Sequence, residues 1–158
     1  MKDKEKYRFK KYSPRYPLIF KKEKQILKII LPNIKIEHVG STSVPNLGGK
    51  GIIDIAISVS KIKIPEAIKK LQKIGYSYQP WSGDKQRKFF QKNNKIHIQL
   101  THNNSTRWKS MIAVRNYLRK NKKARLEYSK IKKQAVKFAD GEGKKYRQYK
   151  EQFLKNIK

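Results

Sequence analysis

Residues 38–59, "HVGSTSVPNLGGKGIIDIAISV", contain the residue types in this chain that are best suited to chemistry. A glycine precedes three hydroxyl side chains, and one carboxylate, Asp54, interrupts an apolar run. A glycine turn with exposed backbone N–H groups and hydroxyls suits phosphate oxygens, and a carboxylate suits a divalent cation. The stretch therefore predicts a site for a phosphorylated ligand. Its phosphate-binding residues would be Gly40, Ser41, Thr42 and Ser43.

Lys50 follows the glycine pair of the same loop and can add a positive charge to the same ligand. The loop alone does not decide the matter, because glycine and serine are also the ordinary residues of a plain turn. Its position directly before the strand that carries Asp54 is what favours a phosphate site.

Alternation along two segments indicates how Asp54 is presented. In residues 52–59, "IIDIAISV", one face of a strand takes the isoleucines, and the other takes Asp54, Ala56 and Ser58. In residues 95–101, "KIHIQLT", the polar face takes His97 and Gln99. If the two strands are neighbours, Asp54 and His97 share one open face. The alternative is a face that is merely solvated, as one side of an antiparallel sheet often is.

The remaining chain predicts the elements that must hold this site. Helical spacing with prolines at both ends indicates a helix within residues 13–33, and alternation indicates a strand at 34–39. A second helix is expected at 64–75, a hairpin with an Asn-Asn tip at 87–101, and three helices at 106–121, 122–140 and 143–158. We expect one α+β domain over residues 1–158, with a small mixed sheet flanked by helices, a helical C-terminal section and a loose start at 1–13.

Composition adds a strong charge and several exclusions. The 41 Lys and Arg residues against 11 Asp and Glu give a formal net charge of +30. Such a charge favours polyanion partners, although the preference for lysine and isoleucine is also what an AT-rich genome produces. No cysteine is present, which excludes disulfides and thiolate metal sites. No apolar run is long enough for a membrane span, so we expect a cytoplasmic protein without a membrane partner.

The segment "IEHVGSTSVPNLGGKGIIDI" resembles the signature of the GrpB family, a group of small bacterial proteins placed in the nucleotidyltransferase superfamily. The segments "RWKSMIAVRNYLRKNKKARLEYSKIKKQ" and "YRQYKEQFL" resemble the C-terminal helices of that family, so the resemblance covers nearly the whole chain. It implies a minimal nucleotidyltransferase fold, in which a Gly-Ser turn binds nucleotide phosphates and a following strand presents two acids to divalent metal.

Residue by residue, the resemblance is incomplete. Gly40 and Ser41 match the turn and Asp54 matches the first acid, whereas Ala56 stands where the second acid would be. His97 and Gln99 occupy the places where a further carboxylate is often found. One aspartate is a poor cage for Mg²⁺, which needs several anionic oxygens in phosphoryl transfer.

Two functions stay open on these grounds, beside a structural or partner-binding domain that has no small ligand. The first is a nucleotidyltransferase-like protein that binds a nucleotide or another phosphorylated ligand. In it Asp54 would hold Mg²⁺ and Lys50 or Arg115 would neutralise phosphate charge, with His97 as a base or a second metal ligand. His97 fits a structural hydrogen bond equally well. The second function is a catalytically degenerate member that acts as a basic module for nucleic acid or another polyanion.

Overall fold

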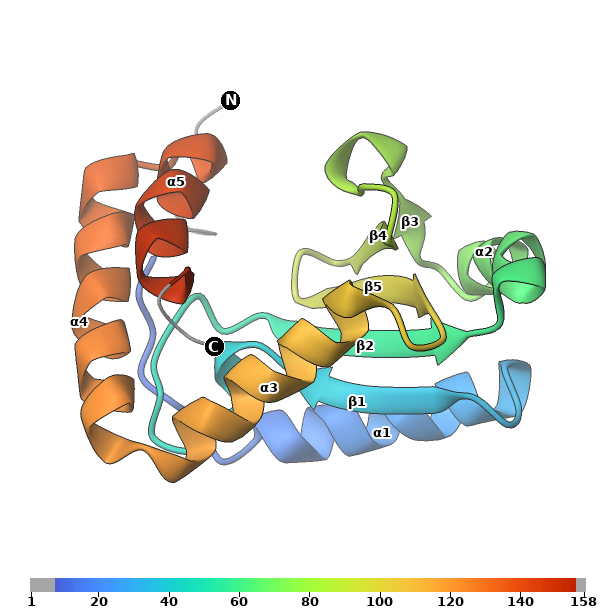
Figure 1. Ribbon diagram of the computed structural model, residues 1–158, viewed down its shortest axis with the longest axis horizontal. Coiled ribbons are helices and arrows are strands. Elements are labelled where there is room, and N and C mark those ends of the chain that lie inside the picture. Colours follow the sequence, from blue (N-terminus) through green and yellow to red (C-terminus); the bar gives the residue numbers. More distant parts are fainter. Residues whose placement is uncertain (1–7, 156–158) are drawn as a thin grey trace.

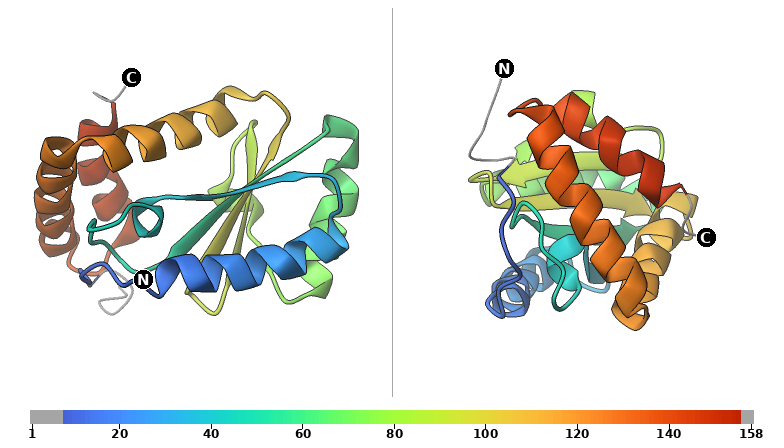
Figure 2. Two further views of the ribbon diagram at one scale, coloured as in Figure 1. Left: turned by 90° about the horizontal axis from the view of Figure 1, so that it is seen from below. Right: turned by 90° about the vertical axis from the view of Figure 1, so that its left-hand side faces the viewer.

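The computed structural model describes residues 8–155, apart from the side chains of Tyr149, Gln152 and Phe153. A mixed sheet lies between two layers of helices, and two further helices stand at one end of it (Figures 1 and 2). The fold is therefore the expected small mixed sheet with a helical C-terminal section. Its elements are α1 (Tyr16–Ile30), β1 (Lys35–Val39), β2 (Ile53–Val59), α2 (Ile64–Lys73), β3 (Ser77–Tyr78), β4 (Arg87–Lys92), β5 (Ile96–His102), α3 (Thr106–Lys120), α4 (Lys122–Ala139) and α5 (Gly143–Leu154).

The five strands lie in the order β1-β2-β5-β4-β3. β2 and β5 are parallel, and the other neighbours are antiparallel. The two segments that alternation predicted to be strands, 52–59 and 95–101, are thus sheet neighbours. Asp54 pairs in register with His97. β4 and β5 form the predicted hairpin, whose tip residues Asn93 and Asn94 both have the positive φ that such a turn requires.

The main core lies between one face of the sheet and helices α1 and α2. It contains the isoleucines of β2, the apolar residues of β5, and Leu27 and Leu71 from the two helices. Helical spacing correctly predicted α1, with Pro17 in the first turn, where a missing N–H costs little. Leu18 and Ile29 of that spacing are nevertheless exposed, so they do not contribute to the buried stripe.

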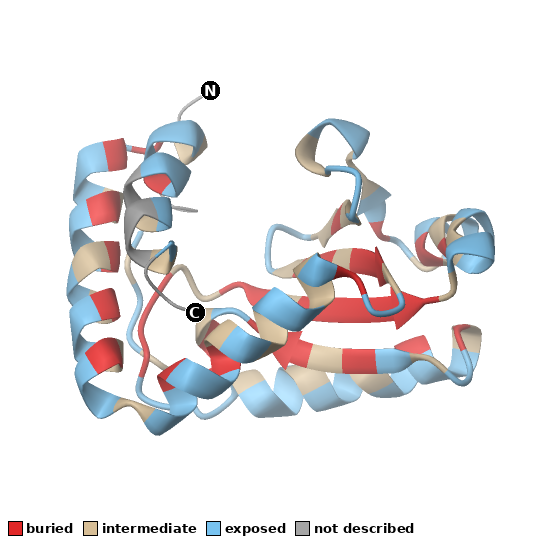
Figure 3. Cartoon of the chain, viewed as in Figure 1, coloured by how far each residue is buried: buried red, intermediate tan, exposed pale blue. Residues whose placement is uncertain are grey.

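The opposite face of the sheet is less open than alternation predicted. Ala56 and Ser58 are buried, because α3 packs across β1, β2 and β5 on this side (Figures 1 and 3). The Asp54 side chain, at the start of β2, keeps 25% of its surface exposed. Room for a ligand is therefore confined to the end of the face where Asp54 lies.

Helices α4 and α5 stand at that same end of the sheet, beside the loop that joins β1 to β2 (Figures 1 and 2). The chain before α1 also reaches this loop, since Lys10 and Gly49 exchange two backbone hydrogen bonds of 2.6 and 2.9 Å. Of the segment expected to be loose, residues 1–7 lie outside the described part. Within residues 8–155, no helix is long and apolar enough to cross a membrane.

Candidate functional site

The turn after β1 places its backbone against the Asp54 carboxylate. Gly40 has φ +74° and ψ −176°, a conformation that essentially only glycine adopts. A Cβ at this position would lie 2.5 Å from Asp54 Oδ2. The glycine is thus required twice, by its backbone angles and by the close approach of the carboxylate. The Gly40 turn and Asp54, which the sequence analysis above predicted to form one site, are therefore in direct contact.

Two of the three hydroxyls in the turn are occupied by its own structure. Thr42 Oγ1 donates to the carbonyl of Ile52 at 3.0 Å and lies 2.9 Å from His38 Nε2. Ser43 Oγ donates to the carbonyl of Gly40. Both side chains are buried. Thr42 and Ser43 therefore hold the shape of the turn, whereas no such bond engages the Ser41 hydroxyl within the described residues.

Asp54 is accompanied by His97 on the neighbouring strand. His97 Nδ1 lies 3.6 Å from Asp54 Oδ1, and the ring meets Phe89 edge-on with centroids 4.8 Å apart. His97 Nε2 is buried and has no hydrogen-bond partner among the described residues. Burial by itself would raise the pKa of Asp54, but His97, followed by Lys50 and Lys150, outweighs it and holds this pKa below its ordinary value. The carboxylate is thus ionised at neutral pH.

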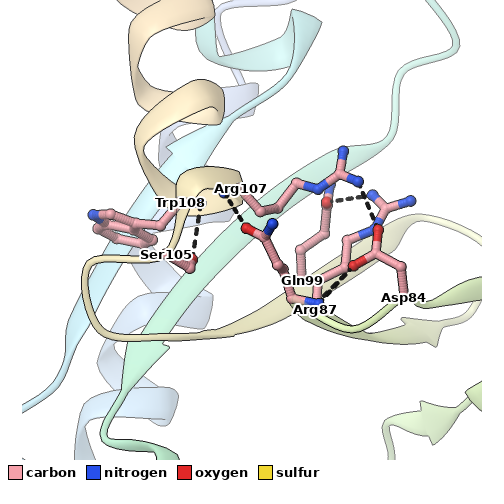
Figure 4. Close-up of polar contacts among 7 residues, drawn as sticks. Asp84, Arg87, Gln99, Ser105, Arg107 and Trp108 are labelled. Atoms are coloured by element: carbon pink, nitrogen blue, oxygen red, sulfur yellow. Dashed lines mark hydrogen bonds and ion pairs between the residues drawn. The ribbon is translucent and has the colours of Figure 1, made fainter.

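The positions that would complete a carboxylate set carry other chemistry. Ala56 is fully buried and pairs in register with Gln99. Gln99 Oε1 accepts a 2.7 Å hydrogen bond from Arg87 Nη1, and Arg87 also pairs with Asp84, which binds Arg107 at 2.6 Å (Figure 4). A guanidinium therefore lies on the strand face where further acids would be needed.

These donors do not fit a pair of magnesium ions held by the protein. Such a pair needs several anionic oxygens, whereas this face supplies Asp54, a second carboxylate, Glu37, that is paired with Arg115, one imidazole, and an amide bonded to an arginine. Nor do the described residues contain a group of three or more His, Asp or Glu side chains that could hold a metal ion. Asp54 remains as a single carboxylate that could contact a cation brought in by a ligand.

Three lysines from distant parts of the chain converge on this end of the sheet. Lys50 comes from the loop, Lys132 from α4 and Lys150 from α5. The Nζ atoms of Lys50 and Lys150 lie 4.6 and 5.2 Å from the ring centroid of Tyr146, and Lys132 Nζ lies 4.7 Å from that of Tyr128. Helices α4 and α5 thus bring cations and aromatic rings to the loop that contains the turn.

Lys132 is the most unusual of the three, since its exposed fraction is 3%. A Cβ at Gly49 would lie 2.6 Å from Ser41 Oγ and 3.0 Å from Lys132 Nζ, so the amine and the hydroxyl sit at the same glycine. Burial lowers the pKa of Lys132 well below its usual value; Lys150 and Lys50 lower it further, and Asp54 offsets only part of this. The cluster holds more positive than negative charge, which a bound anion would relieve.

Sequence reasoning did not identify Lys132 or Lys150. A signal for Lys132 existed, because it lies on the buried stripe of α4, between Tyr128 and Ala135. A lysine at an apolar position of an amphipathic helix is uncommon, since buried lysines need a partner. Its target could not be read from the helix, because the loop that it faces lies more than seventy residues earlier.

Arg115 is not placed with this cluster. Its Nη1 lies 2.8 Å from Glu37 Oε2 and donates to the carbonyl of His38 at 3.1 Å. The side chain is buried between α3 and β1. The guanidinium therefore fastens α3 to the sheet, and Arg115 does not reach the turn and Asp54 as was expected.

Comparison with known proteins agrees with this architecture. The GrpB protein family matches residues 6–158. A UPF0157 protein of Halalkalibacterium halodurans is 32% identical over 127 residues, which is 77% of this chain and 65% of that protein. The UPF0157 protein YqkA of Bacillus subtilis is 31% identical over 150 residues, or 91% of this chain and 44% of that protein. The chain thus spans less than two thirds of the length of either relative.

Among solved structures, the conserved protein GrpB from Enterococcus faecalis superposes with a TM-score of 0.79 at 32% identity, covering 94% of this chain and 98% of the other. The Cid1 poly(U) polymerase bound to MgGTP superposes with a TM-score of 0.55 at 14% identity, covering 81% of this chain and 44% of the other. At that identity the likeness concerns the fold, which is that of nucleotidyltransferases. On these matches, the chain belongs to the GrpB family.

Proposed function

We propose that this protein binds a nucleoside triphosphate, or another ligand with several phosphoryl groups, between the Gly40–Ser41 turn, Asp54 and the three lysines. The observation that carries the proposal is the buried Lys132 beside Ser41, in a cluster where three lysine amines lie near one carboxylate. A fold gains nothing from gathering like charges unless an anion joins them. The fold shared with nucleotide-binding polymerases supports the choice of anion.

Each residue has a distinct part in this proposal. Gly40 lets the backbone approach the ligand, and Ser41 donates a hydroxyl to a phosphoryl oxygen. Lys132 and Lys150 neutralise the phosphate charge, as Lys50 was expected to do from sequence. His97 orients Asp54 rather than transferring a proton, because its Nε2 is buried beside Phe89.

Mg²⁺ enters as the counter-ion of the nucleotide. Asp54 is the carboxylate placed to contact it, because Glu37, the other carboxylate on this face of β1 and β2, is paired with Arg115. The replacement of acids by Ala56 and by the Gln99–Arg87 pair favours binding without two-metal transfer. The alternative function, a basic module for polyanions, also involves binding without two-metal transfer. Its binding does not depend on Asp54 or Lys132.

The test is calorimetric titration with each of the four ribonucleoside triphosphates, with Mg²⁺ and with EDTA. Lys132→Met should weaken binding by tenfold or more, a loss of about 1.4 kcal/mol or above. The matched control is Lys137→Met on an exposed turn of the same helix, which should change affinity less than about twofold. Asp54→Asn should weaken binding in Mg²⁺ but not in EDTA, because only the metal-bound ligand gains from the carboxylate.

Two results would contradict the proposal. One is the absence of saturable binding for all four nucleotides. The other is an equal loss in Lys132→Met and Lys137→Met, which would mean that the general field of the protein, and not the cluster, attracts the ligand.

A further inference from the structure

A cavity lies apart from the Asp54 cluster, between α1, the loop after β1 and the junction of α3 with α4. Its volume is about 440 Å³. Three arginines line it, together with Glu37, His38 and an apolar wall that includes Pro17 and Phe20. Neither Asp54 nor any residue of the lysine cluster is among its lining residues. The cavity is thus a separate feature on the other side of the turn.

The first two arginines, Arg115 and Arg119, come from α3. Arg115 is held by Glu37, as described above. Arg119 Nε donates to the carbonyl of Ser43 at 3.0 Å, which fixes its guanidinium against the turn. Among the described residues, its two terminal nitrogens have no acceptor, so they are available to a ligand in the cavity.

The third arginine, Arg125, comes from the first turns of α4. Its Nη1 donates to the carbonyls of Leu118 and Arg119 at 2.9 and 2.8 Å, which closes the C-terminal end of α3. Within the described part of the chain, Nη2 and Nε of Arg125 have no acceptor. The backbone therefore positions two guanidinium groups before any ligand arrives, which lowers the cost of ordering them.

The charge of the cavity is positive at neutral pH. Burial lowers the pKa of His38 to about 4, so this ring is uncharged, and Glu37 offsets one of the three arginines. Burial and then the neighbouring Arg115 lower the pKa of Arg119, with Glu37 opposing. Two positive charges on the walls of the cavity therefore remain to be matched.

We propose that this cavity binds a small phosphate monoester, whose two negative charges equal the surplus on its walls. Planar guanidinium groups match phosphoryl oxygens by paired N–H bonds. The cavity is several times larger than a phosphate group, and the wall of Pro17 and Phe20 offers apolar contact to the organic group that the phosphate carries. This site is independent of the nucleotide proposal, since it uses other residues.

The experiment measures binding of phenyl phosphate, inorganic phosphate and phenol by calorimetry at pH 7.5. Phenyl phosphate should bind more tightly than inorganic phosphate, because the ring meets the apolar wall, and phenol should not bind. Arg119→Gln and Arg125→Gln should each weaken phenyl phosphate by about tenfold. Arg119→Lys, which keeps the charge but loses the planar guanidinium, should weaken phenyl phosphate binding several-fold. This variant keeps the proposal testable if the glutamine variants fail to fold.

Two variants serve as controls. Lys123→Gln removes a charge from the exposed first turn of α4 without touching the cavity, and Lys132→Met alters the other site; both should bind phenyl phosphate as the natural chain does. The proposal is overturned if phenyl phosphate shows no saturable binding up to ~10 mM, or if Lys123→Gln weakens it as much as Arg119→Gln. Loss of phenyl phosphate binding in Lys132→Met would also overturn it, by assigning the ligand to the first site.

Discussion

At the scale of single residues, the candidate site contains residues whose backbone conformation or burial lowers the stability of the fold. Gly40 adopts a backbone conformation closed to other residues, and Lys132 places an ammonium group where only 3% of its surface is exposed. Neither feature improves packing. Residues that cost stability and converge on one place are typical of functional sites, because their arrangement serves a ligand instead of the core.

This cost predicts that Lys132→Met stabilises the protein without ligand. Methionine fills a similar volume and removes both the buried charge and its repulsion by Lys50 and Lys150. Replacing buried charges with apolar side chains of like size often gains stability, and here we expect about 1 to 2 kcal/mol in the free energy of unfolding. Urea unfolding at pH 7 measures it. A variant less stable than the natural chain would show that the ammonium group has a structural partner.

At the scale of elements, His38 connects a strand, a helix and the turn. Its ring stacks on Phe20 of α1 with centroids 4.7 Å apart, and its Nε2 lies 2.9 Å from Thr42 Oγ1. Because Thr42 in turn donates to Ile52, the imidazole fixes the turn relative to both β1 and β2. The turn that faces Asp54 therefore depends on a neutral histidine on the opposite face of β1.

The buried position of His38 predicts how stability changes with pH. Its pKa is lowered from 6.5 to about 4 by burial, with Arg119 and Arg115 adding to this and Asp54 opposing it. Between these values the unfolded chain binds a proton that the folded chain does not, so stability is full above pH 6.5 and falls as pH decreases toward 4. A shift of this size corresponds to about 2 kcal/mol between pH 7 and pH 4.5.

Urea unfolding at the two pH values checks this, with His38→Gln as the test variant. Glutamine can still donate to Thr42 but does not titrate, so the variant should lose about 2 kcal/mol less than the natural chain between pH 7 and pH 4.5. His102→Gln, at a more exposed histidine, should behave as the natural chain does. Equal losses in all three proteins would show that His38 is protonated in the folded state.

At the scale of the whole molecule, the net charge of +30 predicts a second kind of binding. A surface this basic attracts polyanions by releasing their counterions, without a fixed site. Single-stranded DNA of about twenty thymidines should bind with an affinity that falls roughly tenfold or more between 50 and 200 mM NaCl, as three or more phosphate contacts require.

Fluorescence anisotropy across that range of salt measures this affinity. Asp54→Asn and Lys132→Met should leave it nearly unchanged, because two sites among so many charges contribute little. An affinity that varies less than about twofold with salt would exclude a polyanion-binding surface. A strong loss in Lys132→Met would instead place the DNA in the lysine cluster and join the two proposed functions.

Much of the secondary structure of this protein could be predicted from its sequence. The alternation of residues 52–59 and 95–101, the glycine turn before Asp54 and the helical spacing after Thr106 all predicted elements that the structure contains. These features depend on side-chain direction and backbone preference within a few residues, which is why they can be read locally. The contact of the turn with Asp54 followed from the same local geometry.

Tertiary structure decided the remainder of the site. In the folded chain, α3 covers Ala56 and Ser58, and the hydroxyls of Thr42 and Ser43 bond within the turn. Arg115 binds Glu37. The tertiary structure also brings Lys132 and Lys150 to a loop far earlier in the chain. Such contacts depend on how α3, α4 and α5 dock on the sheet, and docking is set by the packing of whole surfaces. No local pattern in the sequence specifies which polar side chains will meet across those surfaces.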